Sequence, residues 1–293
     1  MSERTFVDRH GVEVFTRWWT LDAPEGVVLV SHGASEHSQR YDRFARALNA
    51  AGFAAVALDH RGHGQTAAGA DRALMGPGGG DAVVDDLHEL RDAVRAELGD
   101  VPTFLFGHSL GALIGLAYLI RHADGLAGAV LCGFPADPDG AAALGEMLRG
   151  LADAGMRDEP LADLVATDAT SDSQRTRYDW LSRDADEVDR YVADPLCGDD
   201  HPLTYGYLLD LFGVVAPARE RLSAITCPVF VIAGDQDPAA GMGAHPTALA
   251  KALEADGVDV ELQLYEGARH ELLNETNRDD VTADLIAWFR AHR

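Results

Sequence analysis

Short apolar runs alternate with helix-type stripes along much of this chain, and this alternation restricts its fold more than any other feature. The run Val27–Val30 contains only valine and leucine and follows a Pro-Glu-Gly turn signal. A short continuous run of this kind is typical of a strand that is buried on both faces of a sheet. We expect strands in five later segments as well: 53–58, 103–107, 126–133, 228–234 and 260–267.

Helical spacing separates these expected strands. Tyr41, Phe44, Ala45 and Leu48 fall on one stripe, and Gly52 ends the pattern just before the next strand. Further helices are expected near 81–98 and 110–122, between the last two strands, and near 281–292. Strands that alternate with helices predict an α/β fold, with a mostly parallel central sheet flanked by helices on both faces.

The N-terminal region carries a different pattern. Two β-type pieces, Thr5–Asp8 and Val12–Trp18, flank a turn candidate that ends in Gly11. We therefore expect a hairpin ahead of the alternating region.

The alternation stops between residues 136 and 216. This segment has no strand-like apolar run and contains helix-type stripes interrupted by Pro160, Pro195 and Pro202. A stretch of about 80 residues is too long for a plain loop. We predict a core made of residues 1–135 and 217–293 and a helical cap over 136–216, placed above the ligand crevice at the carboxyl ends of the strands.

The charge of the chain limits its partners. The formal net charge is −24, and acidic residues are spread along the whole length. An acidic surface repels nucleic acid and anionic membranes, so phosphate-backbone binding is not expected. The sequence defines no oligomeric state.

Three scattered cysteines, Cys132, Cys197 and Cys227, form neither a disulfide framework nor a metal-type pair. The charged N-terminus does not resemble a secretory signal, and the longest apolar run, 111–120, is about half the length that a bilayer requires. We therefore expect a cytoplasmic protein without an integral membrane segment.

One short motif carries candidate chemistry. Gly107–Gly111 reads G-x-S-x-G, with Ser109 at its centre, and lies between an expected strand and an expected helix. This is the context of a nucleophile elbow, in which a sharp turn exposes the serine hydroxyl. The start of the helix directs free backbone N–H groups toward an oxyanion that forms there.

A serine hydroxyl needs a base, and the base needs an orienting carboxylate. His270 follows the last expected strand, while Asp235 and Asp237 follow the strand before it. The carboxyl ends of parallel strands share one edge of a sheet, so these side chains are candidates to meet Ser109. The order serine, aspartate, histidine is that of α/β-hydrolases.

The remaining component is a pair of amides for the oxyanion. Leu110 follows the nucleophile and supplies the first N–H, and Ala34, in the loop after the first buried strand, is our candidate for the second. His32 in the same loop is interpreted as a bracing residue. This chemistry needs no metal and no organic cofactor.

These motifs resemble the monoacylglycerol lipase and lysophospholipase branch of the α/β-hydrolase superfamily. The likeness rests on the blocks VSHGASEHSQRY, DHRGHGQT, GHSLGA, AGDQDP and YEGARHELLNE in that order, and on WLSRDADEVDRYVADPLCG in the insertion. The first half of the insertion departs from the branch.

The resemblance implies the α/β-hydrolase fold and roles for individual residues. Ser109 is the implied nucleophile, His270 the base and Asp237 the acid, because Asp237 stands three residues after a glycine as in the branch. The DHRGHG segment, which contains Asp59, is implied to be a structural turn.

The predicted function is hydrolysis of carboxylic esters through an acyl-enzyme on Ser109, with activity falling below about pH 6.5 as the base becomes protonated. Monoacylglycerols or similar neutral single-chain esters are the first expected substrates, and lysophospholipids are the second. A peptidase or a carbon–carbon bond hydrolase on the same fold is the enzymatic alternative, and a catalytically silent binding module is the non-enzymatic one.

Overall fold

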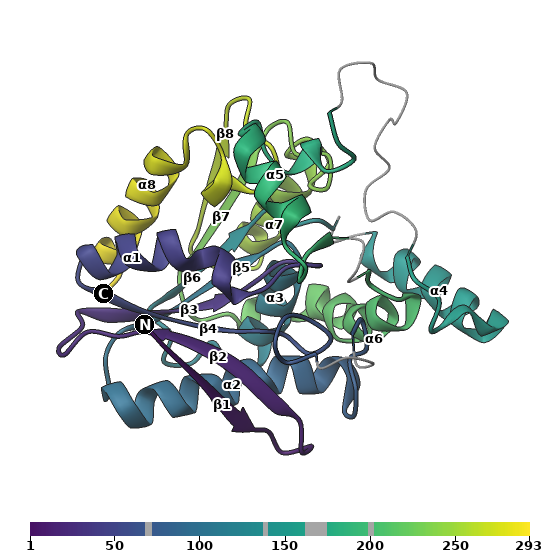
Figure 1. Ribbon diagram of the computed structural model, residues 1–293, viewed down its shortest axis with the longest axis horizontal. Helices are drawn as coiled ribbons and strands as arrows, with labels where there is room; N and C mark the ends of the chain where they lie inside the picture. Colours follow the sequence, from purple (N-terminus) through teal and green to yellow (C-terminus); the bar gives the residue numbers. More distant parts are fainter. Residues whose placement is uncertain (68–71, 137–139, 162–174, 199–201) are drawn as a thin grey trace.

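The strands in the described part of the chain form one eight-stranded sheet, which lies at the centre of the protein (Figure 1). The computed structural model describes residues 1–67, 72–136, 140–161, 175–198 and 202–293. The strands are β1 (Ser2–Val7), β2 (Glu13–Trp19), β3 (Gly26–Ser31), β4 (Phe53–Leu58), β5 (Thr103–His108), β6 (Gly128–Cys132), β7 (Val229–Gly234) and β8 (Val260–Tyr265). Their order across the sheet is β1-β2-β4-β3-β5-β6-β7-β8.

The direction of the strands confirms the predicted fold class. The hairpin β1–β2 is antiparallel and joins β4 in antiparallel register, while every pairing from β4 to β8 is parallel. Each predicted strand overlaps an observed one. The sheet is therefore the mostly parallel one that the alternation of strands and helices predicts.

Helices cover both faces of this sheet (Figure 1). Helices α1 (Asp42–Ala50) and α8 (Arg278–Ala291) pack on one face, and α2 (Gly79–Leu98), α3 (Leu110–His122) and α7 (Ala244–Ala255) pack on the other. Successive residues of a strand point to opposite faces. Accordingly, alternate residues of β3 join different apolar clusters, and the whole strand is buried.

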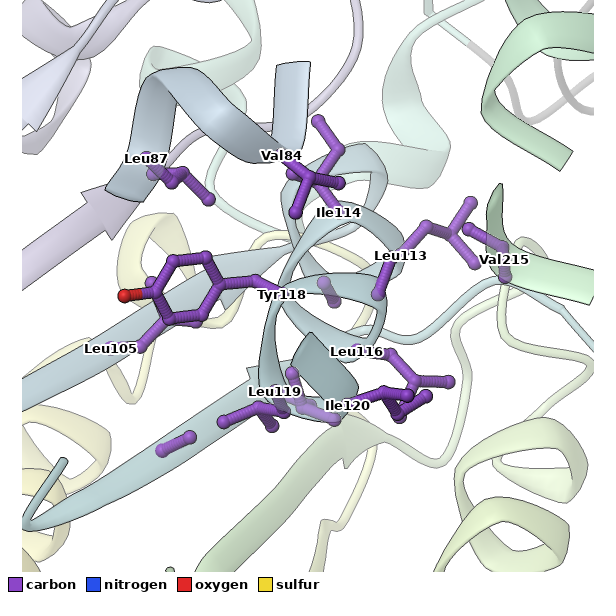
Figure 2. Close-up of a cluster of buried hydrophobic side chains, with 14 of the residues drawn as sticks. Val84, Leu87, Leu105, Leu113, Ile114, Leu116, Tyr118, Leu119, Ile120 and Val215 are labelled. Carbon is purple, nitrogen blue, oxygen red and sulfur yellow. The ribbon is translucent and has the colours of Figure 1, made fainter. Parts of the chain in front are cut away.

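Helix α3 is the most enclosed helix of the core. Its residues from Leu110 to Ile120 are all buried. Figure 2 shows why: its side chains radiate toward α2, toward β5 and toward the end of α6 near Val215. The burial of α3 on all sides holds its first residue in a defined position at the end of β5.

No helix in the described part of the chain combines the length and apolar character needed to cross a bilayer.

The described regular structure between β6 and β7 is mainly helical. It contains α4 (Ala141–Leu151), the short helix η4 (Asp179–Leu181), α5 (Ala185–Ala193), α6 (Tyr205–Val215) and η6 (Ala216–Ala224). Its only described strand-type pairing is an isolated bridge from Pro160 to Thr204. Residues 162–174, which belong to the predicted cap, lie outside the described residues. The division into core and cap remains a proposal.

Candidate active site

The serine of the G-x-S-x-G motif stands on a strained turn between β5 and α3. Ser109 has φ 52° and ψ −114°, outside the conformations that residues with a side chain ordinarily adopt. Its N–H donates to the carbonyl of Cys132 on β6 at 2.9 Å, and its own carbonyl accepts from Leu113 of α3 at 3.1 Å. Strand and helix together hold this strained backbone in place.

The two glycines of the motif permit two close approaches. A Cβ added to Gly107 would lie 2.4 Å from the carbonyl oxygen of Gly111, where the helix folds back over the strand. A Cβ on Gly111 would lie only 2.0 Å from the carbonyl oxygen of Ser31 at the end of β3. Both contacts are with backbone, which cannot move aside. The turn can form only if both positions lack a side chain.

A buried acid–base pair lies at the carboxyl ends of β7 and β8. The Nδ1 atom of His270 is 2.7 Å from Oδ2 of Asp237, and both side chains are buried. The other carboxylate oxygen of Asp237 accepts the amides of Ala239 at 2.9 Å and Ala240 at 3.2 Å. With both of its oxygens engaged, Asp237 can orient the imidazole so that Nε2 is left to act on a proton.

The alternative acid, Asp235, has a different partner. Its Oδ1 accepts the backbone N–H of Gly267 at 2.7 Å, in the turn after β8. Its amide donates to the carbonyl of Tyr265 at 3.1 Å. These bonds stabilise the turn that leads to His270, whereas Asp237 contacts the imidazole itself.

Charges around His270 determine its pKa. Burial alone would lower the pKa, but the carboxylate of Asp237, by charge and by hydrogen bond, acts with the smaller contributions of Glu271 and Glu36 to outweigh burial and raise the pKa above its ordinary value. His108, whose ring centroid is 4.7 Å from that of His270, has its pKa lowered to about 4 by burial and by His270. His108 is therefore neutral near pH 7, and the carboxylates dominate the field at His270.

This field predicts a defined pH dependence. Because the base must be neutral to accept a proton, activity should decrease as the pH falls through the raised pKa of His270, so the acid limb should have its midpoint above pH 6.5. A pH–rate profile of kcat/KM for a neutral ester measures this midpoint. A flat profile down to pH 5 would contradict a role for His270 as base.

The loop after β3 is held in a defined shape. His32 donates from Nδ1 to the carbonyl oxygen of its neighbour Gly33 at 2.7 Å, and its Nε2 accepts the amide of His60 at 2.9 Å. The amide of Gly33 donates to Glu36 at 2.6 Å. Since the Gly33 amide has this partner, Ala34 remains our candidate for the oxyanion donor. It lines the same cavity as Ser109.

Leu110 also lines this cavity. It is the first residue of α3, so its N–H has no partner inside the helix. The amides of Ala34 and Leu110 are thus the two donors that we propose for the oxyanion.

A buried ion network, which the sequence analysis did not identify, joins two loops. One is the loop after β3, which contains Ala34 and Glu36, and the other is the histidine loop, the residues after β8 that include His270 and Glu271. Arg40 donates to Glu36 at 2.7 Å and to both carboxylate oxygens of Glu271, the residue after His270, at 2.6 and 2.7 Å. Burial raises the pKa of Glu36, but Arg40, the nearby histidines and the hydrogen bond from the Gly33 amide together outweigh burial and lower that pKa to about 2. The i, i+4 spacing of Glu36 and Arg40 was a signal for half of this network. Its other half connects residues 231 positions apart.

These residues border a cavity of about 350 Å³. Its polar lining includes Ser109, His108, His270, Glu36 and Glu271. Much of its apolar lining comes from the segment between β6 and β7: Leu144, Met147, Leu148, Leu161, Leu203, Leu208 and Phe212. The candidate nucleophile and base therefore border one space, which is largely covered by apolar side chains.

Polar clusters also lie outside this cavity, among them one around Asp59 and one around His37. Asp59 accepts the amides of Ser38 at 2.8 Å and Gln65 at 2.7 Å, which stabilises the turn after β4. Within the described ranges, His37, Asp194 and Cys197 are a group whose ligand-type atoms lie within 4.8 Å of one another. A hydrogen bond of 3.0 Å between His37 and Asp194 accounts for their approach.

Comparison with known proteins identifies the family. The family described as "Serine aminopeptidase, S33" matches residues 22–277. A monoacylglycerol lipase of Mycolicibacterium smegmatis is 31% identical over 99% of this chain and 98% of its own length, and a monoglyceride lipase of Mus musculus is 29% identical over 98% and 89%. The crystal structure of a thermostable carboxyl esterase from Bacillus coagulans, in complex with glycerol, superposes with a TM-score of 0.90 at 31% identity, covering 99% of this chain and 98% of that one. The chain therefore belongs to this serine aminopeptidase family, within the monoacylglycerol lipase branch of the α/β-hydrolase superfamily.

Proposed function

We propose that this protein is a serine hydrolase that cleaves carboxylic esters, with monoacylglycerols or similar neutral single-chain lipid esters as substrates. The observation that carries the proposal is the buried pair of Asp237 and His270 beside the cavity that Ser109 borders. The similarity to monoacylglycerol lipases along almost the whole chain supports the substrate class.

The proposed reaction proceeds through an acyl-enzyme. The hydroxyl of Ser109 attacks the ester carbonyl while Nε2 of His270 takes its proton, and Asp237 stabilises the resulting imidazolium. The amides of Leu110 and Ala34 stabilise the oxyanion. The imidazolium then protonates the departing alcohol, and water, activated by the same histidine, releases the acid.

The cavity supports a neutral, single-chain substrate. Its apolar lining from the segment between β6 and β7 suits an acyl chain, whose burial contributes about 0.8 kcal/mol for each CH₂ group. The carboxylates of Glu36 and Glu271 near the catalytic groups, and the net charge of −24, disfavour a strongly anionic alcohol group. We propose that residues 136–216 form a cap over this space. We also propose a cytoplasmic location, which the three buried, unpaired thiols suit.

A substrate panel tests the proposed specificity. We expect the highest kcat/KM for monoacylglycerols, lower values for lysophospholipids and short p-nitrophenyl esters, and the lowest for aminoacyl amides. Released fatty acid or chromophore is the measurement. Faster cleavage of aminoacyl amides would replace the proposal by a peptidase, and faster cleavage of lysophospholipids would replace it by a lysophospholipase.

A further inference from the structure

A tryptophan from the segment between β6 and β7 lies against the proposed catalytic base. Trp180 is the central residue of the short helix η4, and its ring centroid is 5.0 Å from that of His270, with an angle of 43° between the ring planes. The side chain is partly buried and borders the cavity. The steps of the proposed mechanism above do not use this ring.

The backbone on each side of Trp180 is bonded to the residues on each side of His270. The carbonyl of Asp179 accepts from the guanidinium of Arg269 at 2.5 Å, and the carbonyl of Leu181 accepts the amide of Glu271 at 2.8 Å. Two residues that flank the tryptophan thus bind two residues that flank the histidine. Such paired bonds fix the register of the two segments and place the two rings opposite each other.

Further contacts hold the same two segments together. Ser182 donates its hydroxyl to the carbonyl of Asn274 at 2.8 Å and accepts from Arg269 at 3.1 Å through its own carbonyl. Arg183 donates its amide and its side chain to the buried carboxylate of Glu275 at 3.0 and 2.8 Å. The segment that carries Trp180 is therefore attached to the histidine loop over several residues.

We propose that Trp180 is a positioning residue for the reaction: its ring holds the imidazole of His270 against Asp237 and stabilises the positive charge that the imidazole acquires from the serine proton. The face of an indole ring attracts a cation, and it does so more strongly at a site shielded from water. This inference rests on the proposed function of His270 as base.

The other groups around the imidazole leave this role open to the tryptophan. The carboxylates that act on His270 are those of Asp237, Glu271 and Glu36, and the neighbouring His108 is neutral near pH 7. These carboxylates are present both when the imidazole of His270 is neutral and when it is charged. An aromatic face adds stabilisation chiefly when the imidazole is charged, which is the state that develops during proton transfer.

Two substitutions separate an aromatic role from simple coverage. Trp180→Phe keeps an aromatic face, while Trp180→Leu keeps only an apolar cover. The test substrate is p-nitrophenyl acetate, whose short acyl group contacts little of the apolar lining of the cavity. We expect Trp180→Leu to lower kcat/KM about 3- to 30-fold and to move the midpoint of the acid limb down by about 0.5–1 pH unit. Trp180→Phe should retain most of the rate and the wild-type midpoint.

Tyr178→Leu is the matched control, since it removes an aromatic ring from the same segment. The described aromatic partner of that ring is Tyr191. It should leave the midpoint of the acid limb unchanged, whatever its effect on KM. An unchanged or raised midpoint in Trp180→Leu, or identical behaviour of the Phe and Leu variants, would overturn the inference, because the ring would then only exclude water. Circular dichroism and thermal unfolding verify the fold of each variant.

Labelling with a small fluorophosphonate separates this inference from the proposed function. If the wild-type protein is not labelled at Ser109, the proposed function fails, and the role of Trp180 that rests on it fails as well. If the wild type is labelled but the Phe and Leu variants have the same pH profile, only the role of Trp180 is rejected.

Discussion

Replacing Ser109 by alanine should reduce ester hydrolysis by at least about 10⁴-fold, because the hydroxyl oxygen that forms the acyl-enzyme is lost. The structure favours a clean result. The backbone at this position is strained with serine already present, and removing one oxygen atom from a side chain at the cavity disturbs no core packing. The initial rate of p-nitrophenyl ester hydrolysis measures the loss.

An exposed serine that does not line the cavity provides the control. Ser223 is exposed and lies in η6, so Ser223→Ala should retain the wild-type rate. A fluorophosphonate probe should label the wild type and the Ser223→Ala variant but not Ser109→Ala. Turnover by Ser109→Ala above about one percent of wild type would show that another group is the nucleophile.

Replacing Asp237 by asparagine should reduce kcat by about 10⁴-fold. An amide at this position can donate to Nδ1 of His270, which lies 2.7 Å from the carboxylate, and this places the proton of the imidazole on Nε2. An imidazole in that tautomer cannot accept the proton of Ser109. The side chain keeps its size, so the free energy of unfolding should change little while kcat falls. Steady-state kinetics measures kcat, and thermal unfolding measures the stability.

Asp235→Asn is the matched control, because the same substitution is made two residues away. Asp235 accepts the Gly267 amide and does not contact the imidazole through any described bond. An asparagine oxygen can accept the same amide, so the rate should fall less than about tenfold. The opposite order of effects would assign the acid role to Asp235.

Local patterns were sufficient for much of the fold. Strands such as β4 and β5 could be predicted because residues buried on both faces must all be apolar, and α3 because its apolar run follows directly from the motif. The candidate residues Ser109, Asp237 and His270 could be found because parallel strands bring their carboxyl ends to one edge. Helix boundaries were predicted less accurately: α8 begins at Arg278, three residues before the predicted start, because its acidic first turn suits the helix N-terminus.

The amino-acid sequence by itself determined the α/β class, the motif at Ser109, the candidate base and two candidate acids, Asp235 and Asp237, since each depends on neighbours within a few residues or on strand order. The resemblance to the lipase branch then favoured Asp237. Only the tertiary structure decided that Arg40 connects Glu36 to Glu271 and that Trp180 lies against His270. The contact between Arg40 and Glu271 joins residues 231 positions apart, and that between Trp180 and His270 joins residues about 90 positions apart. No periodicity encodes which distant side chains will meet, because that depends on how a whole segment packs over the sheet.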